Sequence, residues 1–450
     1  MALTGVQIFK KLPQTNCKEC NFPTCLAFAM ALASAKTEIE KCPYVSKEVK
    51  SELAEASAPP IRGVKIGSGE TAITIGEETV LFRHEKRFEH PTAFGVLITD
   101  EEKETEITRK IKALNETKYL RVGVELKPEL AALKNTSKNK ETFMKLVNTA
   151  RDSVSGCLML MSEDVEILGE AARLCKDKRP ILYAATSDNY QKVAQISKEN
   201  NCPIVARGNG LEELATLTDN LVKTGIKDIV LDSNPSTLKQ AYEDQIFTRR
   251  LSLLKAFRPL GFPTIAFPCE MTDNLMEESL IGTVFISKYA GIVIFSDIQP
   301  HHMLPLLVYR LNLFTDPQRP LTMDEGIYEF GNPDASSPVL ITCNFSLTYF
   351  VVSGEIEASN VPLWLCVMNT DGLSVLTAWS AGKFVPDLIA PFVKKCGIVD
   401  RVKHRNLIIP GYVAQISGEL EEELNKEWNV KVGCREASDL PLFLQQFAKI

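Results

Sequence analysis

Eight short apolar segments, each followed by a stretch of helical periodicity, occupy residues 92–315. Strands of this length alternating with amphipathic helices are typical of parallel βαβ repeats. Eight such repeats in a segment of this length predict a (β/α)8 barrel, and an open doubly wound sheet is the alternative. The predicted strands lie near Phe94–Ile98, Leu120–Glu125, Cys157–Met161, Ile181–Ala185, Pro203–Ala206, Ile229–Asp232, Pro263–Phe267 and Ile292–Ser296.

Polar residues follow most of these strands, at the end where a barrel places its chemistry. Asp188 and the pair Asp232 and Asn234 carry the groups needed to hydrogen-bond a polar heterocycle such as a pterin. Asp, Ser and Asn directly after a strand are also ordinary helix N-caps, and we favour that interpretation. No Lys or His stands at these strand ends in an evident acid–base pairing, so no catalytic residue is assigned.

Four cysteines lie within the first 42 residues, with the spacing Cys17-x2-Cys20-x4-Cys25-x16-Cys42. Three stand on one short loop, and a helix predicted over Leu26–Thr37 returns the chain so that the fourth can reach the same site. Four thiolates in this pattern favour a [4Fe–4S] cluster. A structural zinc ion is the alternative, because four thiolates are also a normal zinc ligand set. The other eight cysteines are dispersed and are expected to be small buried apolar side chains.

Composition narrows the class of protein. A net charge of −6 argues against a nucleic-acid surface, and 45% hydrophobic with 24% charged residues is a soluble globular balance. The longest apolar run, residues 282–295, is interrupted by Lys288, so we expect no membrane span. Nothing at the N-terminus resembles a secretory signal, and we therefore expect a cytoplasmic protein with free cysteines.

Two breaker-rich segments predict the domain limits. Ala56–Gly63 contains two adjacent prolines and is followed by short β-like pieces over Val64–Phe88, which predict a small hairpin or meander. A second such segment, rich in Pro, Gly and Asp, follows the barrel. The predicted parts are residues 1–58 for the cysteine domain, 59–91 for a linker with the hairpin, 92–315 for the barrel, 316–337 for a linker and 338–450 for a third module.

The third module shows four βα repeats, with strands predicted at Val339–Cys343, Leu363–Met368, Asn406–Ile409 and Val430–Cys434. An open parallel sheet binds ligands beyond the carboxyl ends of its strands. Glycines there would let a bulky planar ligand approach the backbone, but Gly and Asp also cap helices, and both interpretations stay open. The candidate ligand-binding residues are Thr342, Asn344, Ser346, Asn369, Thr370, Asp371, Gly372, Leu373, Ser374, Gly411 and Gly433.

Four segments carry a resemblance to a known family: Leu12–Cys25, Lys41–Pro43, Met368–Gly372 and Trp379–Lys383, arranged around the predicted barrel. With them, the whole chain is similar to the large (gamma) subunit of the corrinoid iron–sulfur protein of the anaerobic acetyl-CoA pathway. The resemblance implies an α/β multidomain fold with an N-terminal [4Fe–4S] domain, a central TIM-type barrel and a C-terminal Rossmann-like corrinoid-binding domain. One departure is Asn21, which stands where many related cluster domains carry Gly.

The resemblance implies a methyl carrier rather than a free-standing enzyme. In that family, a cobamide in the Co(I) state accepts the methyl group of methyltetrahydrofolate, which is bound on a separate methyltransferase. It delivers the group, as methyl–Co(III), to the nickel cluster of acetyl-CoA synthase, while the N-terminal cluster reductively reactivates Co(II). The implied partners are a small subunit that completes a heterodimer, the methyltransferase, CO dehydrogenase/acetyl-CoA synthase and a ferredoxin-type electron donor.

The histidines bear on how the cobamide is held. None lies in the Asp-x-His-x-x-Gly motif that supplies the lower cobalt ligand in many methyl-transferring cobalamin domains, and His404 precedes a predicted strand, at the wrong end of the sheet. The resemblance therefore implies a base-off cobamide with no protein histidine ligand. Two other classes of function remain: an iron–sulfur electron-transfer subunit with a flavin or nucleotide domain, disfavoured because no G-x-G-x-x-G follows a predicted strand, and a pterin-dependent barrel methyltransferase.

Overall fold

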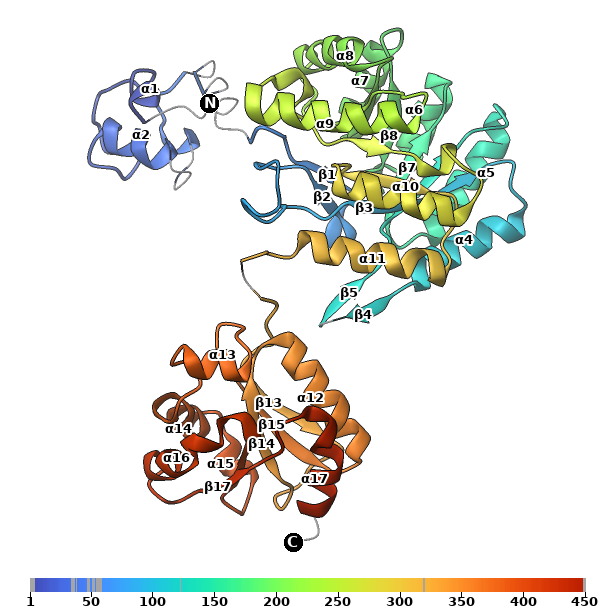
Figure 1. Cartoon of the computed structure of the whole chain (residues 1–450). Coiled ribbons are helices and arrows are strands. Elements are labelled where there is room, and N and C mark those ends of the chain that lie inside the picture. The colour runs from blue at the N-terminus through green and yellow to red at the C-terminus, as the bar shows by residue number, and fades with distance from the viewer. Residues whose placement is uncertain are drawn as a thin grey trace. The chain divides into compact units, whose positions relative to one another are not determined.

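The computed structural model describes residues 5–33, 37, 39–46, 49–50, 53, 59–121, 123–318 and 320–447. The chain divides into two compact units. Unit one comprises Met1–Tyr119 and Leu126–Phe314, and unit two comprises Leu120–Glu125 and Thr315–Ile450. Figure 1 labels many of their helices and strands.

Unit one begins with a small helical segment around the four cysteines. Helix α1 (Gly5–Phe9) packs against α2 (Cys25–Ala33), and the 3-10 turn η1 (Ile39–Lys41) follows. α2 is almost wholly apolar, so its inner residues, among them Phe28, bury in a core with residues of α1 and η1. The helix predicted from Leu26 is confirmed up to Ala33, and residues 34–36 lie outside the described residues.

A hairpin joins this segment to the barrel. β1 (Val64–Ile66) pairs antiparallel with β2 (Ile73–Ile75) across the 3-10 turn η2 (Gly69–Thr71). The apolar side chains of the hairpin are buried among the barrel's inward-facing residues. Gly67 N–H also donates to the carbonyl of Arg179, just before a barrel strand (3.1 Å). The predicted hairpin is thus confirmed, and it closes the amino end of the barrel.

Eight parallel strands form the barrel, each followed by a helix, and their order in the sheet is β10-β9-β8-β7-β6-β3-β12-β11. The two outermost strands are joined only by a parallel bridge between Leu231 and Thr264, so the barrel is nearly closed. The strands are β3 (Ala93–Thr99), β6 (Leu130–Lys134), β7 (Cys157–Met161), β8 (Ile181–Ala185), β9 (Ile204–Arg207), β10 (Ile229–Asp232), β11 (Ile265–Ala266) and β12 (Ile292–Phe295).

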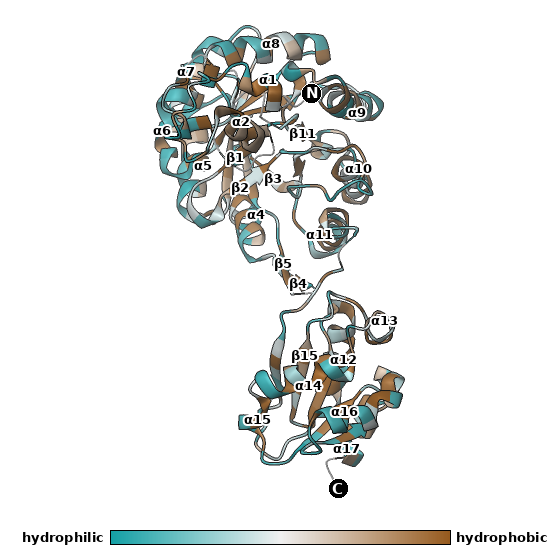
Figure 2. Cartoon of the chain, turned by 90° about the vertical axis from the view of Figure 1, so that its left-hand side faces the viewer, coloured by the Kyte–Doolittle hydropathy of each residue, from teal (hydrophilic) through white to brown (hydrophobic). Residues whose placement is uncertain are grey.

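The outer helices cover these strands in chain order. They are α4 (Glu104–Glu116), α5 (Lys140–Ser153), α6 (Val165–Leu174), α7 (Tyr190–Asn200), α8 (Leu211–Lys223), α9 (Leu238–Lys255), α10 (Leu275–Ser287) and α11 (Pro300–Phe314). Short 3-10 turns are η3 (Lys176–Lys178), η4 (Arg258–Leu260) and η5 (Pro268–Glu270). Figure 2 shows hydrophilic colour along the outside of α6, α7 and α8.

Alternate strand residues build two separate cores, because successive side chains point to opposite faces. Residues such as Leu130 and Met159 fill the barrel interior. Their neighbours, such as Ala131 and Leu160, pack under the helices. The predicted barrel is therefore confirmed.

One predicted barrel strand is wrong. Leu120–Glu125 is not in the barrel; it contributes to a small two-stranded sheet of β4 (Tyr119–Arg121) and β5 (Val124–Leu126), around Gly123 with φ +75°. The barrel strand at this place in the order is β6, which pairs with β3 and β7.

Unit two holds a five-stranded sheet in the order β13-β15-β14-β16-β17. β14 (Val339–Cys343), β15 (Leu363–Met368) and β16 (Asn406–Ile409) have the predicted bounds, and β17 (Asn429–Val432) nearly so. These four strands are parallel. The antiparallel edge strand β13 (Gly326–Phe330) lies within residues 316–337, where the sequence predicts only a linker.

Helices cover both faces of this sheet (Figure 1). α12 (Ser346–Ser359) and α17 (Leu440–Phe447) contact one another. The other helices and turns are α13 (Val375–Ser380), α14 (Pro386–Lys395), α15 (Ile398–Arg401), η6 (Gly411–Ile416), α16 (Ser417–Glu423) and η7 (Ala437–Asp439). Across the described part of the chain, no helix has the length and apolar character that a membrane crossing requires.

Candidate functional sites

The cysteine loop is held by hydrogen bonds between its two ends. Asn16 accepts from Cys25 N–H through Oδ1 (2.8 Å), and Asn16 N–H points back at Cys25 Sγ (3.4 Å). Cys20, Cys25 and Cys42 are buried in one apolar cluster, whereas Cys17 is exposed. The structure thus brings three of the four predicted ligands into one core.

Four residues of the cysteine loop have a left-handed backbone conformation. Gln14, Asn16, Lys18 and Asn21 all have left-handed φ values, between +50° and +67°. Asn21 has φ +64°, and its N–H donates to Lys18 O (2.9 Å). Gly and Asn are the residues that adopt this conformation most readily, so Asn21 is compatible with a position at which related domains carry Gly.

The thiols of this segment suit an iron–sulfur cluster in their chemistry. All four are free, and an N–H group directed at a cysteine sulfur is one of the contacts by which proteins tune such clusters. Among the described residues, no three or more His, Cys, Asp or Glu side chains form a group that could hold a single metal ion.

A crevice of about 350 Å³ lies at the carboxyl ends of the strands in unit two. The chain passes from β14 to β15 on one side and returns to β16 on the other, so the strand order reverses between β14 and β16. The crevice lies beyond this reversal, where open α/β sheets bind ligands. Its walls include Thr342 near the end of β14, Pro410 directly after β16 and Gly433 directly after β17.

The structure separates the predicted ligand-binding residues into two sets. Thr342, Ser374 and Gly433 line the crevice. The other eight do not line it: Asn344, Ser346, Asn369, Thr370, Asp371, Gly372, Leu373 and Gly411. The residues at the end of β14 and after β15 instead form a hydrogen-bonded support beside it.

Asn344 is the centre of that support. Its Oδ1 accepts from Thr370 N–H (2.9 Å), Thr370 Oγ1 (3.0 Å) and Gly372 N–H (3.0 Å), and its Nδ2 donates to Asn369 Oδ1 (3.2 Å). Asn369 N–H in turn donates to Glu325 (2.9 Å), and Lys383 pairs with Asp371. The loop after β15 is therefore fixed by the residue that follows β14.

At two of the predicted ligand-binding glycines, the protein itself leaves no room for a Cβ atom. Gly372 has φ +73°, and a Cβ added there would lie 2.8 Å from Thr322 Cγ2. A Cβ added at Gly411 would lie 2.6 Å from the carbonyl oxygen of Gly433. A positive φ and close side-chain packing thus account for glycine at position 372, and close backbone packing accounts for it at position 411.

Sequence reasoning missed the apolar wall of the crevice. Leu347 and Val351 lie four residues apart on α12, and Leu376 and Tyr412 complete that wall. These four side chains are 45–62% exposed, which is unusual for apolar residues gathered at one place. The i, i+4 spacing of Leu347 and Val351 was the available signal, but α12 is apolar on several sides, so its buried face cannot be read from the pattern.

Ser346, at the start of α12, has a buried hydroxyl group that also draws attention to this region. Its side chain is 1% exposed, and its hydroxyl has no hydrogen-bond partner among the described residues. A buried unpartnered hydroxyl is uncommon in native proteins. It lies one residue from Leu347 on the crevice wall.

Taken together, the fold and these two places define a cofactor-carrying α/β protein, with a cysteine-rich segment, a parallel barrel and an open sheet with a ligand crevice. A family model described as "CO dehydrogenase/acetyl-CoA synthase delta subunit" matches residues 63–444, and a model for an Fe-S cluster matches residues 12–44. The chain belongs to this family, and within it to the large subunits of corrinoid/iron–sulfur proteins.

Two relatives support the narrower assignment. The chain is 43% identical to the corrinoid/iron–sulfur protein large subunit of Moorella thermoacetica over 98% of both chains. It is 31% identical to the acetyl-CoA decarbonylase/synthase complex subunit gamma of Methanothermobacter thermautotrophicus over 100% of both. The family model bears the name of the delta subunit, but it begins at residue 63, whereas the alignments with the relatives include the cysteine segment.

Among solved structures, the dihydropteroate synthase of Thermus thermophilus is similar over 56% of this chain and 99% of its own, with 11% identity and a TM-score of 0.39. A similarity this low says nothing about activity.

Proposed function

We propose that this chain carries methyl groups as the large subunit of a two-subunit corrinoid iron–sulfur protein. The 43% identity to a corrinoid/iron–sulfur large subunit along almost the whole chain supports this most directly. A bound cobamide would supply the chemistry, because its cobalt accepts a methyl group from one partner and releases it to another. The protein's part is to hold the cobamide, supply electrons and present it to its partners.

The proposed electron site is a [4Fe–4S] cluster held by Cys17, Cys20, Cys25 and Cys42. Three of these thiols are buried among apolar side chains, and one is exposed. Burial and N–H contacts to sulfur are the means by which a protein sets a cluster's potential, and exposure at Cys17 gives an electron route to a partner. A ferredoxin-type donor would reduce the cluster, which would reactivate oxidised cobalt.

The proposed cobamide site is the crevice at the carboxyl ends of β14, β16 and β17. Its apolar wall suits the edge of a large planar ring, and Thr342 and Ser374 add hydroxyl groups. We place Asn344, Ser346, Gly411 and the loop Asn369–Leu373 in support of this site. A crevice of about 350 Å³ covers only one edge of a corrinoid, so the small subunit would cover the rest.

A base-off cobamide without a histidine ligand agrees with the position of His404. This is the single histidine in the sequence of unit two. It precedes β16, and its Nε2 lies 2.9 Å from Ser337 O, before β14. His404 is therefore at the amino end of the sheet, opposite the crevice. The remaining proposed partners are a methyltetrahydrofolate methyltransferase and CO dehydrogenase/acetyl-CoA synthase.

Metal content tests this proposal. The full-length chain would be co-expressed with its small subunit in a corrinoid-supplied host and purified without oxygen. We expect about four irons and one cobalt per heterodimer, with the electron paramagnetic resonance signal of base-off Co(II) lost on strong reduction. Iron without cobalt would point to an electron-transfer subunit or a pterin-dependent enzyme instead.

Cysteine variants separate the two metals. Cys20→Ser should lower the iron content and leave cobalt unchanged, because the cysteine segment and the crevice lie in different units. Cys202→Ser is the matched control, since Cys202 is also a buried free thiol but lies in the barrel. Equal iron loss in both variants would remove the support for the assigned ligands.

A further inference from the structure

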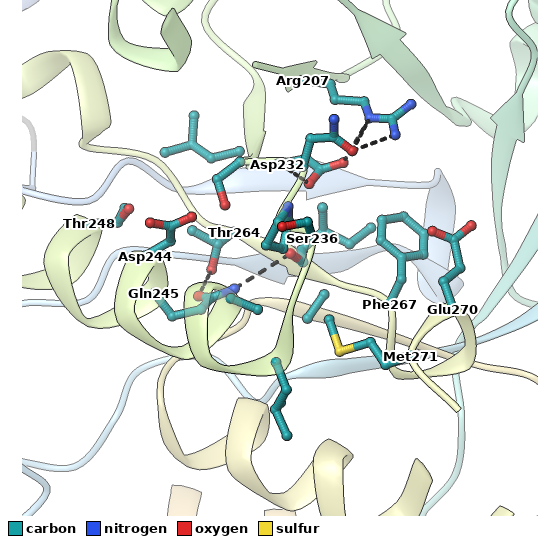
Figure 3. A pocket seen from close by; sticks show the side chains of 18 of the residues that line it. Arg207, Asp232, Ser236, Asp244, Gln245, Thr248, Thr264, Phe267, Glu270 and Met271 are labelled. Carbon is teal, nitrogen blue, oxygen red and sulfur yellow. Dashed lines mark hydrogen bonds and ion pairs between the residues drawn. The ribbon is translucent and has the colours of Figure 1, made fainter. Parts of the chain in front are cut away.

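A cavity of about 380 Å³ opens at the carboxyl end of the barrel, beside the gap between β10 and β11. Figure 3 shows its walls, which include the loop after β10 and one face of α9. A second cavity, of about 500 Å³, lies over the ends of β6, β7 and β8. The two share Tyr183, Arg207 and Glu270. They occupy the end of the barrel at which TIM-type proteins bind ligands.

Asp232 is a buried carboxylate on the wall of the first cavity, with 4% of its surface exposed. Its Oδ2 accepts from Tyr183 Oη (2.6 Å), and its Oδ1 accepts from Asn234 N–H (2.8 Å). Arg207 Nη2 donates to Asn234 Oδ1 (2.6 Å) and so holds the loop in place. A carboxylate has about four acceptor positions, so Asp232 retains acceptor capacity on the cavity side.

Asp244, on α9, adds an unsatisfied acceptor to the same cavity. Its Oδ2 is buried and has no hydrogen-bond partner among the described residues. Burial raises the pKa of Asp244, whereas a hydrogen bond from Ser233 acts in the opposite direction. Nearby, Thr264 and Gln245 satisfy one another (2.5 Å). A buried acceptor without a donor on a cavity wall indicates that a bound molecule or water supplies the donor.

The charges around the cavity favour an uncharged ligand that donates hydrogen bonds. Lys134 is already paired with Glu270 (2.6 Å), and the carboxylates of Asp232 and Asp244 would repel an anion. Arg207 Nε lies 3.7 Å from Asp232 Oδ2, so the positive charge of Arg207 would repel a cationic ligand bound beside Asp232. Within the described residues, no cluster of three or more His, Cys, Asp or Glu side chains is present that could hold a metal ion.

Aromatic rings give the cavity a planar wall. Tyr183 and Phe267 pack edge to face, with ring centroids 5.3 Å apart, and Arg207 lies 5.7 Å from the centroid of Tyr183. Phe267 and Met271 stand on the opposite side of the cavity from Asp244 (Figure 3). A flat ligand ring that lies between Asp244 on one side and Phe267 and Met271 on the other would present its edge to the carboxylates. Its faces would contact the apolar side chains.

We infer that the barrel mouth of this chain binds an aminopyrimidine ring, as found in pterins, whose N–H edge donates to Asp232 and Asp244. The inference is independent of the proposed function, because the barrel site and the cobamide site are separate places on the chain. It assigns the barrel a ligand of its own, in addition to any role as a scaffold.

The test is a fluorescence titration of the full-length chain with pterin (2-amino-4-hydroxypteridine). Lumazine is the matched ligand control, because it carries a carbonyl acceptor where pterin carries the amino donor. Wild-type protein should bind pterin at least tenfold more tightly than lumazine. Asp232→Asn and Asp244→Asn should each weaken pterin binding roughly ten- to a hundredfold, the range for losing a hydrogen bond to a charged group.

Asp188→Asn is the matched control variant, because Asp188 is an exposed carboxylate at the same end of the barrel that lines neither cavity. It should bind pterin as the wild type does. Circular dichroism checks that each variant is folded. If the variant of the buried Asp232 does not fold, Asp244→Asn alone tests the inference. No pterin binding at millimolar concentration, or equal binding of pterin and lumazine, would overturn the inference.

Discussion

Asn344 and Thr370 join the ends of two neighbouring strands through one amide oxygen. Asn344 follows β14 directly, and its Oδ1 accepts from both the N–H and the hydroxyl of Thr370, beyond β15. Both residues are buried, with 5% and 1% of their surfaces exposed. The same oxygen also accepts from Gly372 N–H, so one side chain sets the path of the whole loop beside the crevice.

Replacing Asn344 by Leu should therefore destabilise unit two. The change leaves the backbone N–H groups of Thr370 and Gly372 without their acceptor, whereas the Thr370 hydroxyl can still donate to Leu373 O (2.8 Å). Each buried group left unsatisfied costs about 1–3 kcal/mol. We expect the free energy of unfolding to fall by about 3 kcal/mol. All three tryptophans, Trp364, Trp379 and Trp428, lie in unit two, so their fluorescence in urea measures this directly. Glu357→Gln, on the exposed side of α12, should leave the midpoint unchanged.

Gly372→Ala should lower both stability and cobalt content. The residue has φ +73°, and its new Cβ would lie 2.8 Å from Thr322 Cγ2, so the loop must shift. A left-handed conformation alone costs a non-glycine residue about 1–2 kcal/mol. Gly354→Ala on α12 is the control, because its Cβ would meet nothing within 4 Å. Cobalt content equal to that of Gly354→Ala, with iron intact, would contradict the proposed position of the loop near the cobamide.

The sequence could show the barrel because its strands are continuous apolar runs. The prediction failed at Leu120–Glu125, where Leu and Val around a glycine are typical of a strand. These residues do belong to strands, but in a separate two-stranded sheet. The true barrel strand, Leu130–Lys134, contains two alanines and only a short apolar run, so local preference understated it. Only the pairing with β3 and β7, which is a long-range contact, decides between them.

The predictions for the polar residues that follow the barrel strands were also correct only in part. The cap interpretation is confirmed for Asp164, whose side chain accepts from two N–H groups at the start of α6. It is wrong for Asp232, because Thr237 caps α9 and Asp232 turns to Tyr183 instead. Tyr183 lies 49 positions away in the sequence, so no local pattern could show this contact. The strand-end positions were predictable, but the partner of each side chain was not.

A buried ion pair should matter more than its exposed neighbour in unit one. Arg249 on α9 donates to Glu78 (3.0 Å) and to Val80 O (2.7 Å), and both charged side chains are less than 10% exposed. Breaking a buried pair leaves a charge without its partner, which costs about 3–5 kcal/mol. Glu78→Gln should therefore lower the free energy of unfolding of unit one by about 3 kcal/mol, measured by circular dichroism.

The adjacent residue supplies the control for that measurement. Glu77 pairs with His90 but is half exposed, and exposed pairs contribute about 0–1 kcal/mol. Glu77→Gln should therefore change stability by less than 1 kcal/mol. If the two variants were equally stable, the segment before the barrel would not be held by the Arg249 contact.

His302 should make unit one sensitive to acid. Its side chain is completely buried on α11, neither ring nitrogen has a hydrogen-bond partner among the described residues, and the ring packs edge to face on Phe295. Burial lowers the pKa of His302 to about 4, against the opposing charge of Asp297. Between about pH 4 and the ordinary value of 6.5, the unfolded chain binds a proton at this residue that the folded chain does not.

Stability should therefore rise with pH through that window and become constant above it. At pH 4.5 the protonation of the unfolded state costs about 2–3 kcal/mol relative to pH 7.5. His302→Phe removes the titrating group while keeping a ring against Phe295. The variant should lose about 2–3 kcal/mol less stability than the wild type between these two pH values, as measured by urea unfolding followed by circular dichroism. His301→Phe, at the exposed neighbouring position, should keep the wild-type slope, and a parallel flattening in both variants would show that the acid sensitivity lies elsewhere.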